Sequence, residues 1–144
     1  MNIKDILLTV IGTIGGFISW LFGGWSTAMI TLIVFMAVDY LTGLIVAGVF
    51  KKSKKSDSGA LESRAGFKGL CKKGVILLVV LVAAQLDLLT GSNFIRDAVI
   101  IAFVANEALS IVENAGLMGI PIPPPITRAI EALRGKEDKP PDEG

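Results

Sequence analysis

Polar side chains interrupt the last apolar run of this chain, where lipid would not accommodate them but a protein interior could. The run at residues 94–114 begins as an apolar helix, but five polar residues then crowd into nine positions: Asn106, Glu107, Ser110, Glu113 and Asn114. At 100° per residue these side chains fall within an arc of about 120°, and Arg96 projects onto the same arc. Carboxylates inside a membrane are expensive and normally face protein or a water-filled cavity. This polar stripe is therefore the first candidate functional feature.

Four apolar runs determine the fold class. The chain has 144 residues, of which 52% are hydrophobic, and its mean hydropathy is +0.67. A chain this small and this apolar is too hydrophobic for an ordinary soluble domain. The sequence predicts a single all-α integral membrane unit with about four transmembrane helices in two hairpins, at residues 5–22, 26–50, 74–90 and 94–114.

The first run, residues 6–22, contains no charge. Seventeen residues cover roughly 25 Å as a helix, which is a short but credible span. A signal peptide is the competing interpretation, but no small-x-small cleavage site precedes Trp20 and Trp25, which resemble interfacial anchors. Gly12 and Gly16 form a GxxxG pair and predict a face on which another helix can pack closely.

The second run contains one charge near its middle, Asp39. Asp39, Gly43 and Ala47 recur every fourth residue, so the carboxylate shares its face with small residues that permit close helix packing. Two interpretations stay open. Asp39 is either a buried polar contact that fixes the register of the helices, or a pore-facing or protonatable carboxylate.

A basic connector at residues 51–73 separates the two predicted hairpins. It holds eight of the fourteen basic residues against two acidic ones, Asp57 and Glu62. The positive-inside rule places this connector in the cytoplasm, where anionic lipid headgroups, rather than nucleic acid, are its expected partners. Its first part predicts a flexible loop and its second a short helix on the membrane surface. The basic residues are Lys51, Lys52, Lys54, Lys55, Arg64, Lys68, Lys72 and Lys73.

The third run ends at Asp87, which we expect close to the outer interface. Short, nearly uncharged turns at residues 23–24 and 90–93 would lie outside. Together with a cytoplasmic connector, they predict four crossings with both termini in the cytoplasm.

Residues 115–144 change character and predict a cytoplasmic segment. Gly116 and Gly119 end the preceding helix, and the sequence IPIPPP forms a stiff connector. A short amphipathic helix follows, beginning with Pro125 and carrying Ile126, Ile130 and Leu133 at helical spacing. The final residues, 136–144, are charged and predict a disordered tail.

No catalytic or cofactor-binding arrangement is apparent. The chain has no histidine, a single cysteine, Cys71, and no nucleophile, phosphate-binding or metal-ligand motif. Glu107 and Glu113 differ by about 120° around a helix and need not converge on one substrate. We therefore expect neither an enzyme nor a bound metal or cofactor.

Several segments resemble the toxin-secretion and phage-lysis holins. The usual pattern of that family has Asp-Tyr-x-Thr-Gly, a lysine-rich connector, and Asn-Glu-x-x-Ser-x-x-Glu-Asn followed by glycine and proline. The matching segments are VDYLTGLIVAG at 38–48, GFKGLCKKG at 66–74, LVAAQLD at 81–87, and FVANEALSIVENAGLMGIPIPPPITRAIEAL at 103–133. The resemblance covers nearly the whole chain after about residue 25.

The resemblance implies a homo-oligomer of the bacterial inner membrane that assembles timed lesions, through which an endolysin or a toxin leaves the cell. Direct contact between the homo-oligomer and this endolysin or toxin is not required. Our hypothesis is that small oligomers hide their polar residues against each other and that assembly turns the polar stripe toward water. Helix contacts would use Gly12/Gly16 and Gly43/Ala47. The hidden residues would be Asp39, Asp87, Asn106, Glu107, Ser110 and Glu113.

Two alternatives remain. The chain could be a small ion-translocating or transporter-accessory membrane protein in which Asp39 or Glu107 is a protonation site. It could also be a scaffold whose connector and C-terminal helix recruit a partner. Induced expression distinguishes them, because only a holin makes the membrane permeable to large molecules.

Overall fold

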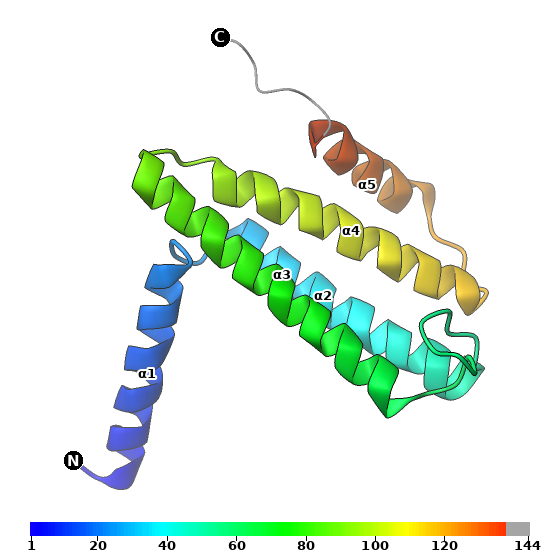
Figure 1. Cartoon of the computed structure of the whole chain (residues 1–144), viewed down its shortest axis with the longest axis horizontal. Helices are drawn as coiled ribbons and strands as arrows, with labels where there is room; N and C mark the ends of the chain where they lie inside the picture. The colour runs from blue at the N-terminus through cyan, green and yellow to red at the C-terminus, as the bar shows by residue number, and fades with distance from the viewer. Residues whose placement is uncertain (138–144) are drawn as a thin grey trace.

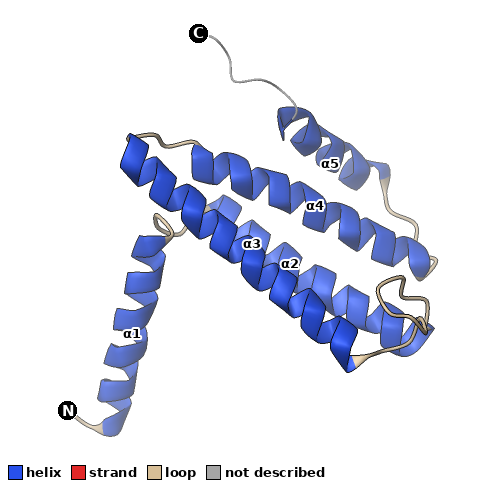
Figure 2. Ribbon diagram, in the orientation of Figure 1, coloured by secondary structure: helices blue, strands red, loops and turns tan. Residues whose placement is uncertain are grey.

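The fold is entirely helical over the residues that the computed structural model describes, 1–137 (Figures 1 and 2). The predicted all-α class is therefore confirmed for this part of the chain. The predicted disordered tail lies outside the described residues from position 138 onward, and its first two residues end the last helix. The helices are α1 (Ile3–Leu21), α2 (Thr27–Ile45) continued by the π-helical η1 (Val46–Phe50), α3 (Ser63–Thr90), α4 (Ile95–Leu117) and α5 (Pro124–Glu137).

Helices α2, α3 and α4 form a bundle in which α3 runs antiparallel to the other two (Figure 1). Helix α2 packs along α4 more extensively than along α3. Apolar side chains at helical spacing face inward from each helix, because spacings of three, four and seven residues return to the same face. In lipid, close packing of such side chains holds helices together. The core consists of Met29, Leu32, Met36, Val80, Ile100 and Val104.

Three helices are long and apolar enough to cross a membrane: α1, α2 with η1, and α3. The sequence predicts that α4 crosses as well, but α4 does not meet the same criteria of length and hydropathy. Helix α4 instead lies along two helices that do.

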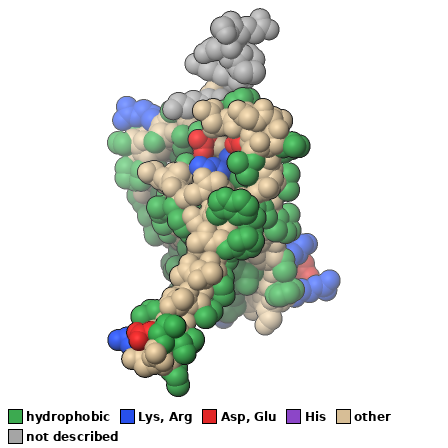
Figure 3. Space-filling view, turned by 90° about the vertical axis from the view of Figure 1, so that its left-hand side faces the viewer, with side chains coloured by type: hydrophobic (Ala, Val, Ile, Leu, Met, Phe, Trp, Pro, Cys, Tyr) green, Lys and Arg blue, Asp and Glu red, His purple; other side chains and the backbone are tan. Residues whose placement is uncertain are grey.

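Helix α1 leaves the bundle and packs on little of it (Figure 1). None of its residues is buried, and a side chain added at Gly12 or Gly16 would meet nothing within 4 Å. The predicted packing face of α1 is thus open in the single chain. Figure 3 views the molecule from the side where α1 leaves the bundle and shows hydrophobic side chains over much of that side.

Helix α5 turns back and packs against α4 (Figure 1). It begins at Pro124, one residue before the predicted start. Ile130 is buried and Leu133 packs against the bundle core, whereas Arg128, Glu131 and Arg134 are exposed. Two of the three apolar residues in the predicted pattern thus dock this helix, whereas the third, Ile126, is 48% exposed.

The connector differs from its prediction in two ways. Helix α3 begins at Ser63 and is continuous, so residues 63–73 are not a separate surface helix. Residues 51–62 form a folded loop in which the Ser53 amide donates to the Gly59 carbonyl at 2.9 Å and the Ser56 hydroxyl to the Ala60 carbonyl at 2.7 Å. Hydrogen bonds from the hydroxyl and amide of Ser58 hold the pKa of Glu62 below its ordinary value. Serine side chains thus fold a segment whose composition suggests flexibility.

We expect Gly59→Ala to open the connector loop. Gly59 has φ +75°, and an added Cβ would lie 2.7 Å from the Lys51 carbonyl oxygen. The left-handed conformation alone costs a non-glycine residue about 1–2 kcal/mol. Trypsin should then cleave after Lys51 to Lys55 faster than in the unmodified protein, with helix content unchanged. Gly74→Ala is the control, because the added methyl meets nothing within 4 Å inside a helix. Equal cleavage rates in both variants would contradict the folded loop.

Candidate functional site

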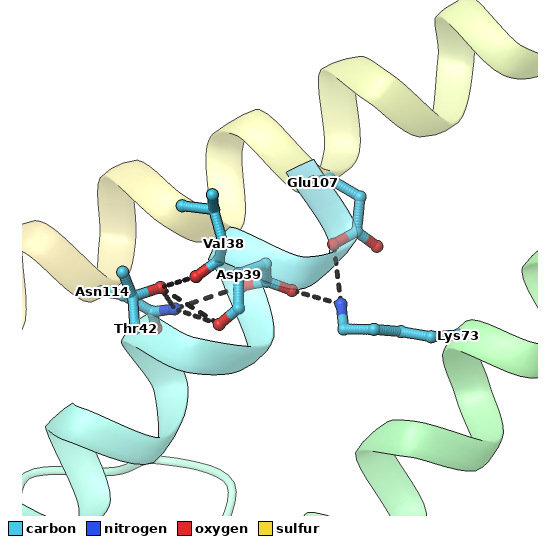
Figure 4. A network of polar contacts seen from close by, with 6 residues as sticks. All are labelled: Val38, Asp39, Thr42, Lys73, Glu107 and Asn114. Atoms are coloured by element: carbon cyan, nitrogen blue, oxygen red, sulfur yellow. Dashed lines mark hydrogen bonds and ion pairs between the residues drawn. The ribbon is translucent and has the colours of Figure 1, made fainter. Parts of the chain in front are cut away.

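A lysine shared by two carboxylates joins the three helices of the bundle (Figure 4). Lys73 on α3 places its Nζ 2.7 Å from Oδ2 of Asp39 on α2 and 2.7 Å from Oε2 of Glu107 on α4. The segments that carry these residues are far apart in sequence, and only the folded bundle brings them together. We refer to Asp39, Lys73 and Glu107 as the charged triad.

The charged triad is buried. Asp39 is 4% exposed and Glu107 is 6% exposed, while the Lys73 side chain is 14% exposed. An unpaired ion in such surroundings costs several kcal/mol, about the size of a small domain's whole stability. Each carboxylate therefore depends on Lys73 for its charge compensation. Helix α3 packs mainly on α4 and touches α2 little, and the triad is a link that joins all three helices.

Asn114 completes the polar network on the other side of Asp39. Its Nδ2 donates to Asp39 Oδ1 at 3.1 Å and to Thr42 Oγ1 at 2.9 Å, and Thr42 in turn donates to the Val38 carbonyl at 2.8 Å (Figure 4). A side chain added at Gly43 would lie 3.9 Å from Asn114 Nδ2, so the small residue stands where α4 approaches α2. Ala47, one turn further, is buried. Asp39 thus lies in a buried contact that joins α2 to α3 and α4.

The polar stripe of α4 is divided between two environments. Glu107 and Asn114 point into the bundle, whereas Asn106 and Glu113 are exposed and Ser110 is half-buried. The arc of about 120° that the spacing predicts is wide enough to straddle the boundary of a helix interface. The stripe therefore contains both a structural half and an exposed half.

Arg96 and Asp87 lie at the opposite end of the bundle and do not join the triad. Arg96 Nη1 donates to the carbonyls of Phe22 at 2.7 Å and Gly24 at 2.9 Å, which fixes the turn between α1 and α2. Asp87 accepts from the backbone amides of Ile95 at 3.0 Å and Arg96 at 2.9 Å. It satisfies amides at the start of α4, where a helix leaves them without partners.

The prediction for Lys73 is wrong. The sequence groups it with the membrane-surface lysines, whereas the structure places it in the charged triad. The other six lysines of that set, Lys51, Lys52, Lys54, Lys55, Lys68 and Lys72, are exposed. A signal was present in the sequence. Lys73 stands three residues before Ile76 and seven before Val80, both of which face the bundle. Because the predicted third helix begins at residue 74, Lys73 lies outside it, and its spacing to Ile76 and Val80 is not considered.

Within residues 1–137 the structure offers no group of three or more His, Cys, Asp or Glu side chains that could hold a metal ion. Cys71 is an exposed free thiol on α3. The polar chemistry of the described bundle thus consists of ion pairs and hydrogen bonds between helices.

Fold and site together define a small helical membrane protein whose buried carboxylates are paired with a lysine of another helix. A profile of the bacteriophage holin family matches residues 16–135, and the chain belongs to that family. Holins form membrane pores and are not enzymes. The resemblance noted in the sequence is thereby confirmed at the level of the family.

One of the individual relatives is itself named as a holin. A probable holin of Bacillus phage phi105 is 32% identical over 109 residues, covering 75% of each chain. An uncharacterised 14.9 kDa protein of Clostridium perfringens is 38% identical over 138 residues, covering 94% of this chain and 98% of its own length. An uncharacterised protein of Listeria monocytogenes is 36% identical over 129 residues, covering 87% and 86%. No solved structure matches the chain.

Replacing Lys73 tests the triad. Lys73→Met keeps a long unbranched side chain but removes the ammonium group, so two buried carboxylates have no counter-ion. We expect a loss of about 3–5 kcal/mol in the free energy of unfolding. Denaturant unfolding of the purified protein in detergent, followed by circular dichroism, measures this loss.

Two further variants give that result its meaning. Lys72→Met changes the exposed neighbouring lysine and should leave stability nearly unchanged. Adding Asp39→Asn and Glu107→Gln to Lys73→Met removes the orphaned charges and should restore much of the loss. If Lys73→Met and Lys72→Met unfold at the same denaturant concentration, the triad does not stabilise the bundle.

Proposed function

We propose that the chain homo-oligomerises in the bacterial inner membrane and opens timed lesions through which an endolysin, or in some hosts a toxin, leaves the cell. Family membership supports the holin role. The structural support comes from one asymmetry: large hydrophobic side chains are exposed on α1, α2 and α3, but none is exposed on α4.

The exposed residues of α4 are polar or small instead: Asp97, Ala98, Asn106, Glu113 and Gly116. Lipid cannot hydrate the side chains of Asn106 and Glu113, so this edge of α4 requires water or another protein surface. The outward faces of α2 and α3 carry Ile33, Leu41, Leu78 and Val82, which suit lipid. Each bundle thus has a lipid-compatible side and a water-compatible side.

This asymmetry suggests how subunits arrange in a lesion. Copies that turn α2 and α3 toward lipid present the exposed edge of α4 to the interior of a ring. The charged outer face of α5, with Arg128, Glu131 and Arg134, also needs water. The open face of α1, with Gly12 and Gly16, is then available to a neighbouring subunit.

Four crossings with both termini cytoplasmic fit this arrangement. The six exposed lysines between α2 and the middle of α3 favour the cytoplasmic side for that end of the bundle. Helix α4 would cross as part of the bundle, sheltered on one side by α2 and α3 and wetted on the other. Glu107 and Asn114 would stay inside each subunit, so the lumen would be lined by the exposed half of the polar stripe alone.

Introducing leucines on the exposed edge of α4 tests the lumen. Asn106→Leu with Glu113→Leu leaves the buried network intact but makes the edge apolar. We expect normal membrane insertion and a release of cytoplasmic reporter protein that is at least several-fold slower after induction. Val79→Leu with Val82→Leu adds leucines to the exposed face of α3 and serves as the control, which should keep the original release time.

Two outcomes would count against the proposal. Release by the α4 variant at the original time would mean that this edge does not line the lesion. An unmodified protein that depolarises cells but never releases a cytoplasmic protein would favour an ion-translocating protein over a holin.

A further inference from the structure

A cavity of about 360 Å³ opens where α2 ends and α3 begins. Its lining comes from α2, the folded connector, the first half of α3 and the middle of α4. The charged triad, with Asp39, Lys73 and Glu107, forms one part of that lining. The pairing of the helices accounts for the triad in this lining and the proposed lesion for Asn106, but neither gives its other lysines or its apolar residues a role.

Basic side chains in the lining have no ionic partner of their own. Lys55, Lys68 and Lys72 line the cavity, and within residues 1–137 none of them makes an ion pair. The acidic lining residues are already engaged. Asp39 and Glu107 share Lys73, and Glu62 accepts two hydrogen bonds from Ser58. The four lysines of the lining, Lys73 included, exceed its three carboxylates by one, so the lining keeps a net positive charge that a ligand can compensate.

The rest of the lining is largely apolar. Leu44, Ala47, Leu61 and Ile76 line the same cavity as the three lysines. A free inorganic anion would use the lysines but gain nothing from these side chains. A ligand that carries an anionic group on a hydrocarbon body would satisfy both parts of the lining.

The cavity also lies at the depth of a membrane surface. In α3 the basic residues end at Lys73, and the uncharged stretch that follows continues to Leu86. Lys68 and Lys72 are one helical turn apart, just before this stretch, at the level where lipid phosphates lie. The connector is already folded, so Lys55 is held near them at little additional entropic cost.

We propose that this lysine-rimmed cavity binds one anionic phospholipid, with the phosphate at Lys55, Lys68 and Lys72 and the glycerol and upper acyl chain against Leu44 and Leu61. The site goes beyond the proposed function, because it requires only that the bundle sits in a membrane. It also goes beyond general attraction of a basic segment to a negative surface, since particular lysines take part and others do not.

The experiment measures lipid binding to the purified full chain in neutral detergent. Thermal unfolding is followed while dioleoylphosphatidylglycerol, dioleoylphosphatidylcholine or inorganic phosphate is added, and native mass spectrometry counts the lipids retained. We expect a saturable rise in Tm with phosphatidylglycerol only, and one retained lipid per chain.

A matched pair of variants locates the site. Lys55→Gln, Lys68→Gln and Lys72→Gln together should weaken the phosphatidylglycerol response at least tenfold. The control carries Lys51→Gln, Lys52→Gln and Lys54→Gln, which remove the same charge outside this cavity and should keep the response. Circular dichroism checks that both triple variants retain their helix content.

Equal losses in the two triple variants would overturn the proposal and indicate unspecific electrostatic attraction. An equal response to phosphatidylcholine, or to inorganic phosphate, would overturn it as well, because the site would then not select an anionic lipid. Since these measurements involve no lysis, a failure here leaves the proposed lesion untouched, and a failure to release protein leaves the lipid site untouched.

Discussion

A lysine that compensates two carboxylates is the interaction on which the bundle depends. Lys73 lies 2.7 Å from both Asp39 and Glu107, and each acid comes from a different helix. Charges of this kind are not tolerated by lipid, and in a membrane the apolar side chains alone give little preference for one helix partner over another. Pairing the charges therefore specifies which helices meet and in which register. The apolar core supplies close packing among α2, α3 and α4, with α3 packed mainly on α4, and the triad adds the charged link between α3 and α2.

The three sequence signatures of the family resemblance meet in this one region. Asp39, Thr42 and Gly43 stand beside Asn114, the last residue of the signature on α4. Tyr40 donates its hydroxyl to the Gly66 carbonyl at 3.3 Å and lies against Gly69, so the two glycines in the first turns of α3 allow α3 to approach α2. These motifs therefore describe contacts between helices of one subunit. A motif rich in acids and amides inside a membrane segment need not mark a lumen, because half of its members can be used to assemble the subunit itself.

The sequence was sufficient to predict the helical class, the glycine turns and the polar residues that matter, because each leaves a local signal. Apolar length, Gly23 and Gly24, and the spacing of Glu107 and Asn114 can be read without knowing what lies opposite. The identity of the partners could not be read in this way. The spacing of the stripe gives its direction on α4, but only packing against two neighbours determines that Glu107 faces inward and Asn106 does not. For Lys73, the spacing to Ile76 and Val80 can be read from the sequence, but its two carboxylate partners on other helices cannot.

The division of the polar stripe separates two tasks that a single set of residues could not perform together. If Glu107 and Asn114 had to face water during assembly, Lys73 would lose one of its two carboxylates and Asp39 its amide donor, which would weaken the links of α4 to α2 and α3. Asn106 and Glu113 lie on the exposed edge, so in the proposed lesion copies would associate and admit water along α4 while each charged triad stays closed. Assembly is then a rearrangement between preformed bundles. The open face of α1 suits such a rearrangement. A helix with no buried residue can change its neighbours without disturbing the core of α2, α3 and α4.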